Sequence, residues 1–231
     1  MTKKRHYEAL FFDLDDTLLS FSKASKAAFR AVFEEQGLPY SRRLFARYEV
    51  INLAYWKNLE KGLVTMEVLS YRRFEDLFRE FSIDADPHLI GERYFYHLQF
   101  QHQKMPYMAS VLRELRKRGY LLYVITNGEA RTQKRRYHDS GLDKLTERQF
   151  ISGEMGCKKP DVRYFEIIEE TVRIPRENIL LIGDSLSSDI SGGKNYGIDT
   201  CWMTPENTPE DPAVLPDYRI SDLRQLLDIL P

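Results

Sequence analysis

The sequence has only two cysteines among its 231 residues, Cys157 and Cys201, which are too few for a disulfide framework or a site built from several thiolates. It also lacks an excess of one charge, because 34 basic residues face 35 acidic ones, so no overall field favours a nucleic acid polymer or an anionic membrane. No apolar run approaches the roughly 20 residues that a membrane-spanning helix needs. We expect no signal peptide in segment 1–6, which is basic but has no apolar stretch. These absences predict a soluble, cytoplasmic globular protein.

Short apolar segments alternate with helical patterns over much of the chain. The strands that we expect are residues 7–12, 120–126, 149–152, 179–182, 200–203 and 218–220. The helices that we expect between them are residues 108–118, 131–140, 163–172 and 190–196. This alternation predicts βαβ units and a parallel sheet covered by helices on both faces.

Residues from about 22 to 103 differ, because they contain no strand pattern and at least four helical ones. Ser41 and Thr65 stand where the N-caps of two of these helices are expected. Asp86 followed by Pro87 is a typical cap and first residue of another. The segment therefore predicts a small helical bundle inserted after the first strand.

Polar residues stand where three of the predicted strands end: Asp13, Asp15, Thr126, Asn127 and Asp184. Ligands of open α/β sheets bind beyond the carboxyl ends of the strands, so we expect these side chains to converge. Asp13 and Asp15 share one side of an extended chain, and two carboxylates so close repel unless a cation binds them. Asp184 and Asp189 add oxygen ligands of the kind that Mg²⁺ prefers.

Each pattern taken alone also has an ordinary structural explanation. Asp15 or Asp16 could cap the helix after the first strand, and Asn127 before Gly128 is a common turn sequence. The basic segment 131–136 is most simply the solvated face of a helix, because the chain is neutral overall. The order of the polar motifs and their common place at strand ends nevertheless favour one shared site.

Four motifs in this order resemble those of the haloacid dehalogenase superfamily of phosphotransferases, over essentially the whole chain. They are Phe12-Asp-Leu-Asp-Asp-Thr-Leu18, Ile125-Thr-Asn-Gly128, Lys158-Lys-Pro-Asp161, and Ile182-Gly-Asp-Ser185 followed by Asp189. The resemblance implies an α/β fold, a doubly wound parallel-sheet (Rossmann-like) core with a small α-helical cap domain. The expected boundaries are 1–18 and 106–231 for the core and 19–105 for the cap.

The same resemblance implies phosphoryl transfer through an aspartyl-phosphate. Asp13 is then the nucleophile, and Asp15 is the acid that protonates the leaving group and the base that activates water. The cofactor implied is Mg²⁺, held by Asp13, Asp184 and the backbone carbonyl of Asp15.

Phosphate-binding residues are also implied, namely Thr126, Asn127 and Lys159. Lys159 is expected rather than Lys158, because the family places its lysine directly before proline. Asp189 is expected to orient Lys159 or a metal-bound water.

Within the superfamily, Asn52-x-x-x-Trp56, Glu60-x-Gly62 and Arg73-Phe74 are similar to the cap of bacterial nucleotidases, including pyrimidine 5′-nucleotidases. This similarity implies that the partner is a small phosphomonoester such as a nucleoside 5′-monophosphate. Phe21, Asn52, Trp56 and Arg73 are the cap residues expected to contact it, although Trp56 could equally belong to the core of the cap.

Several other functions share these motifs. A sugar-phosphate or phosphoglycolate phosphatase and a phosphomutase both fit them. A dehalogenase needs a carboxylate nucleophile but no acid two residues further, so Asp15 favours a phosphate ester as substrate. A catalytically silent binding module is disfavoured, because every ionisable residue that the chemistry needs is present. The sequence does not fix the oligomeric state.

Overall fold

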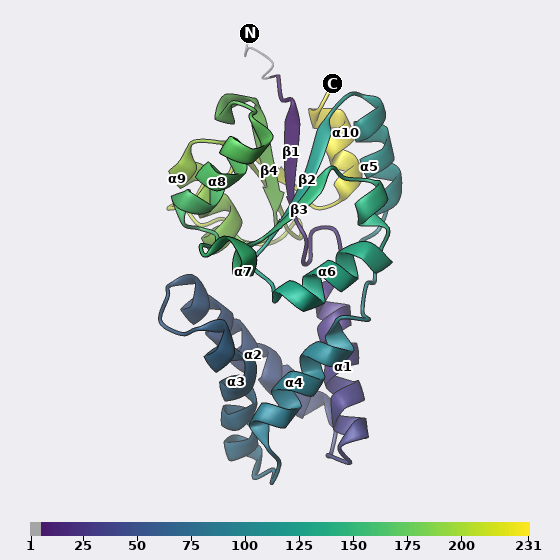
Figure 1. Ribbon diagram of the computed structural model, residues 1–231, viewed down its shortest axis with the longest axis vertical. Coiled ribbons are helices and arrows are strands. Elements are labelled where there is room, and N and C mark those ends of the chain that lie inside the picture. Colours follow the sequence, from purple (N-terminus) through teal and green to yellow (C-terminus); the bar gives the residue numbers. More distant parts are fainter. Residues whose placement is uncertain (1–5) are drawn as a thin grey trace. The chain divides into compact units, whose positions relative to one another are not determined.

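The structure is a computed structural model that describes residues 6–231, so the signal-peptide prediction for segment 1–6 falls almost wholly outside the described residues. The chain divides into two compact units. One, the core unit, runs to Ser20 and resumes at Gln103, and the other, the helical unit, is Phe21–His102 (Figure 1). Within residues 6–231, every helix is too short or too polar to span a membrane.

Six parallel strands form the sheet of the core unit, in the order β3-β2-β1-β4-β5-β6. They are β1 (Ala9–Asp13), β2 (Leu121–Thr126), β3 (Arg148–Ile151), β4 (Ile179–Gly183), β5 (Asp199–Met203) and β6 (Tyr218–Ile220). The strand order reverses at β1, which pairs with β2 on one side and with β4 on the other. In a doubly wound sheet, ligands bind beyond the carboxyl ends of the strands at such a point. The predicted fold class is confirmed.

Helices cover both faces of this sheet. They are α5 (Met108–Lys117), α6 (Ala130–Asp139), α7 (Ser152–Met155), α8 (Val162–Val172), α9 (Ser191–Tyr196) and α10 (Leu226–Ile229), with single turns η1 (Leu142–Lys144), η2 (Arg176–Asn178), η3 (Leu186–Ile190) and η4 (Leu223–Gln225). Alternate residues of β1 enter two different cores. Leu10 and Phe12 pack with α5 and α10, whereas Ala9 and Phe11 pack with α8 and α9 (Figure 1). All four side chains are buried, which explains the continuous apolar run of this strand.

The helical segment after β4 begins earlier than the predicted residue 190. A π-helical turn, η3, precedes α9. The Ser185 hydroxyl accepts a hydrogen bond from the Ser188 amide at 3.2 Å, and the Asp189 carboxylate accepts one from the Ser185 amide at 3.1 Å. These side-chain contacts start the turn and direct Asp189 back toward the end of β4.

Four helices make up the helical unit. They are α1 (Phe21–Glu35), α2 (Arg42–Glu60), α3 (Met66–Phe81) and α4 (Pro87–Leu98). The predicted caps are confirmed, because the side chains of Ser41, Thr65 and Asp86 each accept a hydrogen bond from a backbone amide of the first turn. α4 packs against α1 and α3, and α3 packs against α2. Their shared core is rich in aromatic side chains.

Candidate active site

Asp13 ends β1, and a tight turn after it carries Asp15. The amides of Leu18 and Leu19 both donate to the Leu14 carbonyl, at 3.0 and 2.9 Å. Asp16 adopts a left-handed conformation with φ 53°, which aspartate tolerates better than most side chains. The Asp13 side chain is 9% exposed and that of Asp15 is 26% exposed, so the turn places one nearly buried carboxylate and one more accessible carboxylate at the end of the strand.

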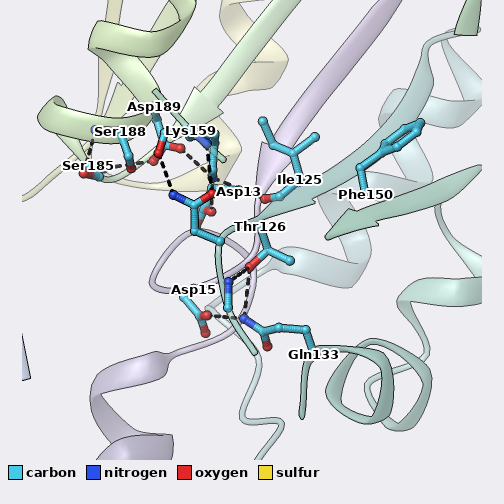
Figure 2. Close-up of polar contacts among 12 residues, drawn as sticks. Asp13, Asp15, Ile125, Thr126, Gln133, Phe150, Lys159, Ser185, Ser188 and Asp189 are labelled. Atoms are coloured by element: carbon cyan, nitrogen blue, oxygen red, sulfur yellow. Dashed lines mark hydrogen bonds and ion pairs between the residues drawn. The ribbon is translucent and has the colours of Figure 1, made fainter. Parts of the chain in front are cut away.

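The ammonium group of Lys159 lies between two carboxylates. Its Nζ is 2.5 Å from Asp13 Oδ1 and 2.7 Å from Asp189 Oδ1 (Figure 2). The side chain is 1% exposed. Burial alone would lower the pKa of Lys159, but Asp13 and Asp189 outweigh that effect and raise it. Lys159 therefore stays a cation in contact with the first candidate carboxylate.

Asp13, Asp184 and Asp189 form an acidic cluster, with one carboxylate oxygen of each within 4.8 Å of the others. Burial raises the pKa of Asp13 to about 8, which Lys159 opposes and Asp189 reinforces. Burial also raises the pKa of Asp184, and the neighbouring Asp13 and Asp189 add to that shift. Trp202 Nε1 donates to the backbone carbonyl of Asp184 at 2.7 Å and so fixes the end of this strand. Crowded carboxylates that resist ionisation are a donor set that suits a divalent cation such as Mg²⁺.

Asp189 approaches the strand end because Gly183 has no side chain there. A Cβ on Gly183 would lie 2.4 Å from Asp189 Cγ, which is far inside van der Waals contact. Both oxygens of Asp189 already accept from the protein, Oδ1 from Lys159 and Oδ2 from the Ser185 amide. Asp189 is therefore arranged to orient the lysine.

Thr126 ends β2 and Asn127 follows it, and both side chains contact residues of the same region. Asn127 forms a reciprocal pair with the Lys159 backbone, donating from Nδ2 to its carbonyl at 2.8 Å and accepting from its amide at 3.0 Å. Thr126 Oγ1 accepts from the Gly128 amide at 3.1 Å and from Gln133 Nε2 at 3.0 Å. Because its oxygen accepts twice, the Thr126 hydroxyl can still donate its own proton in a further hydrogen bond.

Two residues of α6 contact Asp15, and the sequence analysis missed both. Gln133 Nε2 lies 2.6 Å from Asp15 Oδ2, and Arg136 Nη1 lies 2.5 Å from Asp15 Oδ1; Figure 2 shows the contact with Gln133. The interpretation of segment 131–136 as a solvated face is wrong for Gln133 and Arg136, which are 2% and 0% exposed. The usable signal is their spacing, because residues three apart share one face of a helix.

The predicted substrate residues of the cap all lie in the helical unit. Arg73 and Asn52 are buried, and Arg73 Nη1 donates to Asn52 Oδ1 at 2.7 Å. Phe21 and Trp56 are half-buried, and Phe21 packs against the aromatic core of this unit. The indole N–H of Trp56 is buried and has no hydrogen-bond partner within the described residues.

Comparison with known proteins places this site in a family. Residues 7–197 match the hydrolase family described as haloacid dehalogenase-like hydrolase. The chain is 38% identical to the HAD-hydrolase YfnB of Bacillus subtilis, over 98% of this chain and 96% of that protein. It is 35% identical to the pyrimidine 5′-nucleotidase PynA of Streptococcus pneumoniae, over 97% of this chain and 95% of that protein.

A solved structure agrees with this relationship. The crystal structure of YfnB bound to magnesium matches with a TM-score of 0.92 at 37% identity, covering 97% of this chain and 99% of that one. The acidic cluster, the buried lysine and the strand order thus occur in a chain that aligns over nearly its whole length with a known hydrolase, and this protein belongs to the haloacid dehalogenase-like hydrolase family.

Proposed function

We propose that this hydrolase cleaves phosphomonoesters with Mg²⁺ through an aspartyl-phosphate on Asp13, and that its substrates are nucleoside 5′-monophosphates, pyrimidine nucleotides foremost. The observation that carries the proposal is the Asp13 carboxylate at the end of β1, 2.5 Å from buried Lys159 and part of the acidic cluster. The similarity to PynA over nearly the whole chain supports the substrate class.

The chain's own residues account for both halves of such a reaction. In the first, an Asp13 oxygen attacks phosphorus, the bond from phosphorus to the ester oxygen breaks, and the proton of Asp15 goes to that oxygen. In the second, water attacks phosphorus, gives a proton to Asp15, and the bond between phosphorus and Asp13 breaks. Lys159 and the Thr126 hydroxyl supply the cation and the donor that bind the phosphoryl oxygens.

A bound Mg²⁺ would be held by Asp13, Asp184 and the backbone carbonyl of Asp15, and it supplies positive charge between two anions that must approach each other. The crowded carboxylates of the acidic cluster fit this cation. The similarity to YfnB, whose structure is bound to magnesium, supports the same assignment.

Hydrolysis of a panel of phosphomonoesters by the purified protein tests the proposal. The panel comprises pyrimidine and purine nucleoside 5′-monophosphates, sugar phosphates, phosphoglycolate and p-nitrophenyl phosphate, each with Mg²⁺ and with EDTA. We expect turnover only with Mg²⁺ and the highest kcat/KM for pyrimidine nucleotides. A clear preference for a sugar phosphate would refute the nucleotidase assignment, and full activity in EDTA would refute the metal assignment.

Asp13→Asn tests the mechanism, because it keeps the shape of the side chain and removes the nucleophile. We expect a loss of kcat of more than about a thousandfold with the fold intact, in line with other nucleophile replacements. Retention of a tenth of the activity would refute the aspartyl-phosphate route.

Among the predicted cap residues, the half-buried Phe21 and Trp56 are assigned to select the leaving group, whereas Asn52 and Arg73 are buried against each other and are assigned to support them rather than to contact it. The unpartnered indole N–H of Trp56 supports this assignment, because a buried donor without an acceptor is costly. Trp56→Ala should raise KM for pyrimidine nucleotides much more than for p-nitrophenyl phosphate. Trp56→Phe, which keeps a ring but not the N–H, separates stacking from hydrogen bonding.

A further inference from the structure

We propose that Gln133 and Arg136 are positioning residues, which hold the Asp15 carboxylate in one orientation and connect it to the phosphate-binding hydroxyl of Thr126. The inference rests on the proposed function, in which Asp15 transfers protons, and it assigns a role to two residues of α6 that no motif includes.

The contacts of Asp15 define its orientation. Oδ2 accepts from Gln133 Nε2 at 2.6 Å and Oδ1 accepts from Arg136 Nη1 at 2.5 Å. Arg136 Nη1 also donates to Gln133 Oε1 at 2.9 Å. The three side chains thus form a closed triangle of hydrogen bonds. With one donor on each oxygen, the carboxylate cannot rotate without breaking a contact.

Gln133 also connects Asp15 to the group expected to bind phosphate. Its Nε2 carries two protons, and it reaches both Asp15 Oδ2 and Thr126 Oγ1. The same amide therefore holds the acid/base carboxylate and orients the Thr126 hydroxyl. Replacing Gln133 would therefore disturb two groups of the proposed mechanism, Asp15 after β1 and Thr126 at the end of β2.

Gly128 leaves the space through which the Gln133 side chain reaches Asp15. A Cβ at position 128 would lie 2.0 Å from Gln133 Nε2 and 2.5 Å from its Cδ. No alanine fits there unless the Gln133 side chain moves away from Asp15. Glycine therefore suits the end of the second motif, because the Gln133 side chain occupies the space that a Cβ would fill.

Burial makes the arrangement rigid. Gln133 and Arg136 are 2% and 0% exposed, whereas the neighbouring Arg135 is exposed and pairs with Asp139 on the same helix. An anionic partner offsets the desolvation cost of a buried guanidinium, and Asp15 supplies one to Arg136. α6 therefore presents one face to the site and the opposite one to water.

Gln133→Leu is the main test, because it removes the amide without removing a charge. We measure kcat and KM on p-nitrophenyl phosphate, whose leaving group needs no proton, and on a nucleoside 5′-monophosphate, whose leaving group needs one. We expect kcat on the nucleotide to fall about tenfold to a hundredfold, as for a misplaced catalytic group, with a smaller fall on p-nitrophenyl phosphate. KM should stay within about threefold on both substrates.

A double-mutant cycle separates positioning from general damage. On an Asp15→Asn background, Gln133→Leu should lower kcat for p-nitrophenyl phosphate by a smaller factor than it does in the wild type, because its contact with Asp15 no longer matters and only its contact with Thr126 is still lost. Gly128→Ala should reproduce the single-variant effect by displacing the same side chain. Arg136→Lys, which keeps a donor for Asp15, should retain more activity than Arg136→Met.

Arg135→Met is the matched control, since it removes an arginine from the solvent face of α6 and should leave both activities unchanged. The inference would be overturned if Gln133→Leu lowered kcat by the same factor in the wild-type and Asp15→Asn backgrounds. It would also be overturned if kcat of Gln133→Leu on the nucleotide stayed within twofold of wild type. Either result leaves the proposed function standing. If the wild-type protein hydrolyses no phosphomonoester, the proposed function fails and the inference falls with it.

Discussion

The two units of the molecule each bury a cation completely, but they hold it in different ways. In the core unit, Lys159 lies between the carboxylates of Asp13 and Asp189. In the helical unit, Arg73 has no ion pair within the described residues. Its Nη1 donates to the neutral Asn52 side chain, and its Nε and Nη2 have no hydrogen-bond partner in the part of the chain that the structure describes. The guanidinium carbon lies 4.6 Å from the ring centre of Tyr94, with three further rings within 5.8 Å.

The two cations therefore have different roles. Lys159 balances the charge of two carboxylates, whereas Arg73 is held by aromatic rings and one amide. Lys159 neutralises carboxylates that the proposed chemistry requires, so its removal leaves those carboxylates buried and unpaired. Arg73 is stabilised by aromatic faces, each worth about 0.5–2 kcal/mol, and no carboxylate among residues 6–231 pairs with it. Four perturbations test this contrast.

Lys159→Met should have the largest effect. It leaves Asp13 and Asp189 without their buried partner, so we expect the free energy of unfolding to fall by about 3–5 kcal/mol and hydrolysis to be lost. Urea unfolding followed by circular dichroism measures the first, and the phosphomonoester assay measures the second.

Lys158→Met is the matched control, because Lys158 is the preceding residue and has no ion pair within residues 6–231. It should change stability by less than about 0.5 kcal/mol, as surface substitutions do. Similar losses of stability and of hydrolysis in Lys159→Met and Lys158→Met would contradict the assignment of Lys159 as the phosphate-binding lysine.

The acidic cluster gives the second prediction, a pH dependence with a definite sign. Because the pKa of Asp13 rises from 3.8 to about 8, the metal-free folded state binds more protons than the unfolded chain between these pH values. Its stability therefore falls as pH rises through that window. Mg²⁺ binds the ionised carboxylates and should reverse the trend, adding about 2–3 kcal/mol at a concentration 100 times its Kd.

Thermal unfolding with Mg²⁺ and with EDTA, at about pH 5 and about pH 8, checks this prediction. The rise in Tm from Mg²⁺ should be larger at the higher pH and should disappear in Asp184→Asn. A rise that is independent of pH would contradict binding at this cluster.

The sequence was sufficient to predict the sheet, the inserted helices and the convergence of carboxylates at the strand ends, because these depend on local patterns. Three patterns can be read without a structure: apolar segments that alternate with helical ones, N-caps such as Ser41, and polar residues at strand ends. It was not sufficient for Gln133 and Arg136. A helix whose buried face is polar has the pattern of a solvated helix, and only the tertiary fold shows that a carboxylate lies opposite that face.

Asn52→Leu is the third perturbation and addresses the helical unit. It removes the acceptor of Arg73 Nη1 and leaves that donor buried without a partner. Hydrogen bonds to charged groups are worth about 1.5–3 kcal/mol, so we expect a loss of about 2 kcal/mol in urea unfolding. A loss as large as that of Lys159→Met would show that Asn52 matters as much to Arg73 as the two carboxylates matter to Lys159.

Arg73→Met should have the smallest effect, although Arg73 is as fully buried as Lys159. The substitution gives up the contacts with the rings and one hydrogen bond. It also removes the desolvation cost of a charge that no carboxylate of the described chain offsets, and methionine fills much of the space. We expect a change in unfolding free energy of less than about 1.5 kcal/mol, smaller than that of Asn52→Leu, because removing a buried donor costs less than leaving it unsatisfied. Arg72→Met on the same helix is the control, since that arginine is exposed and pairs with Glu75, and its loss should cost under about 0.5 kcal/mol. If Arg73→Met instead costs as much as Lys159→Met, four aromatic faces stabilise a buried cation as well as two carboxylates do, and the contrast between the two units is wrong.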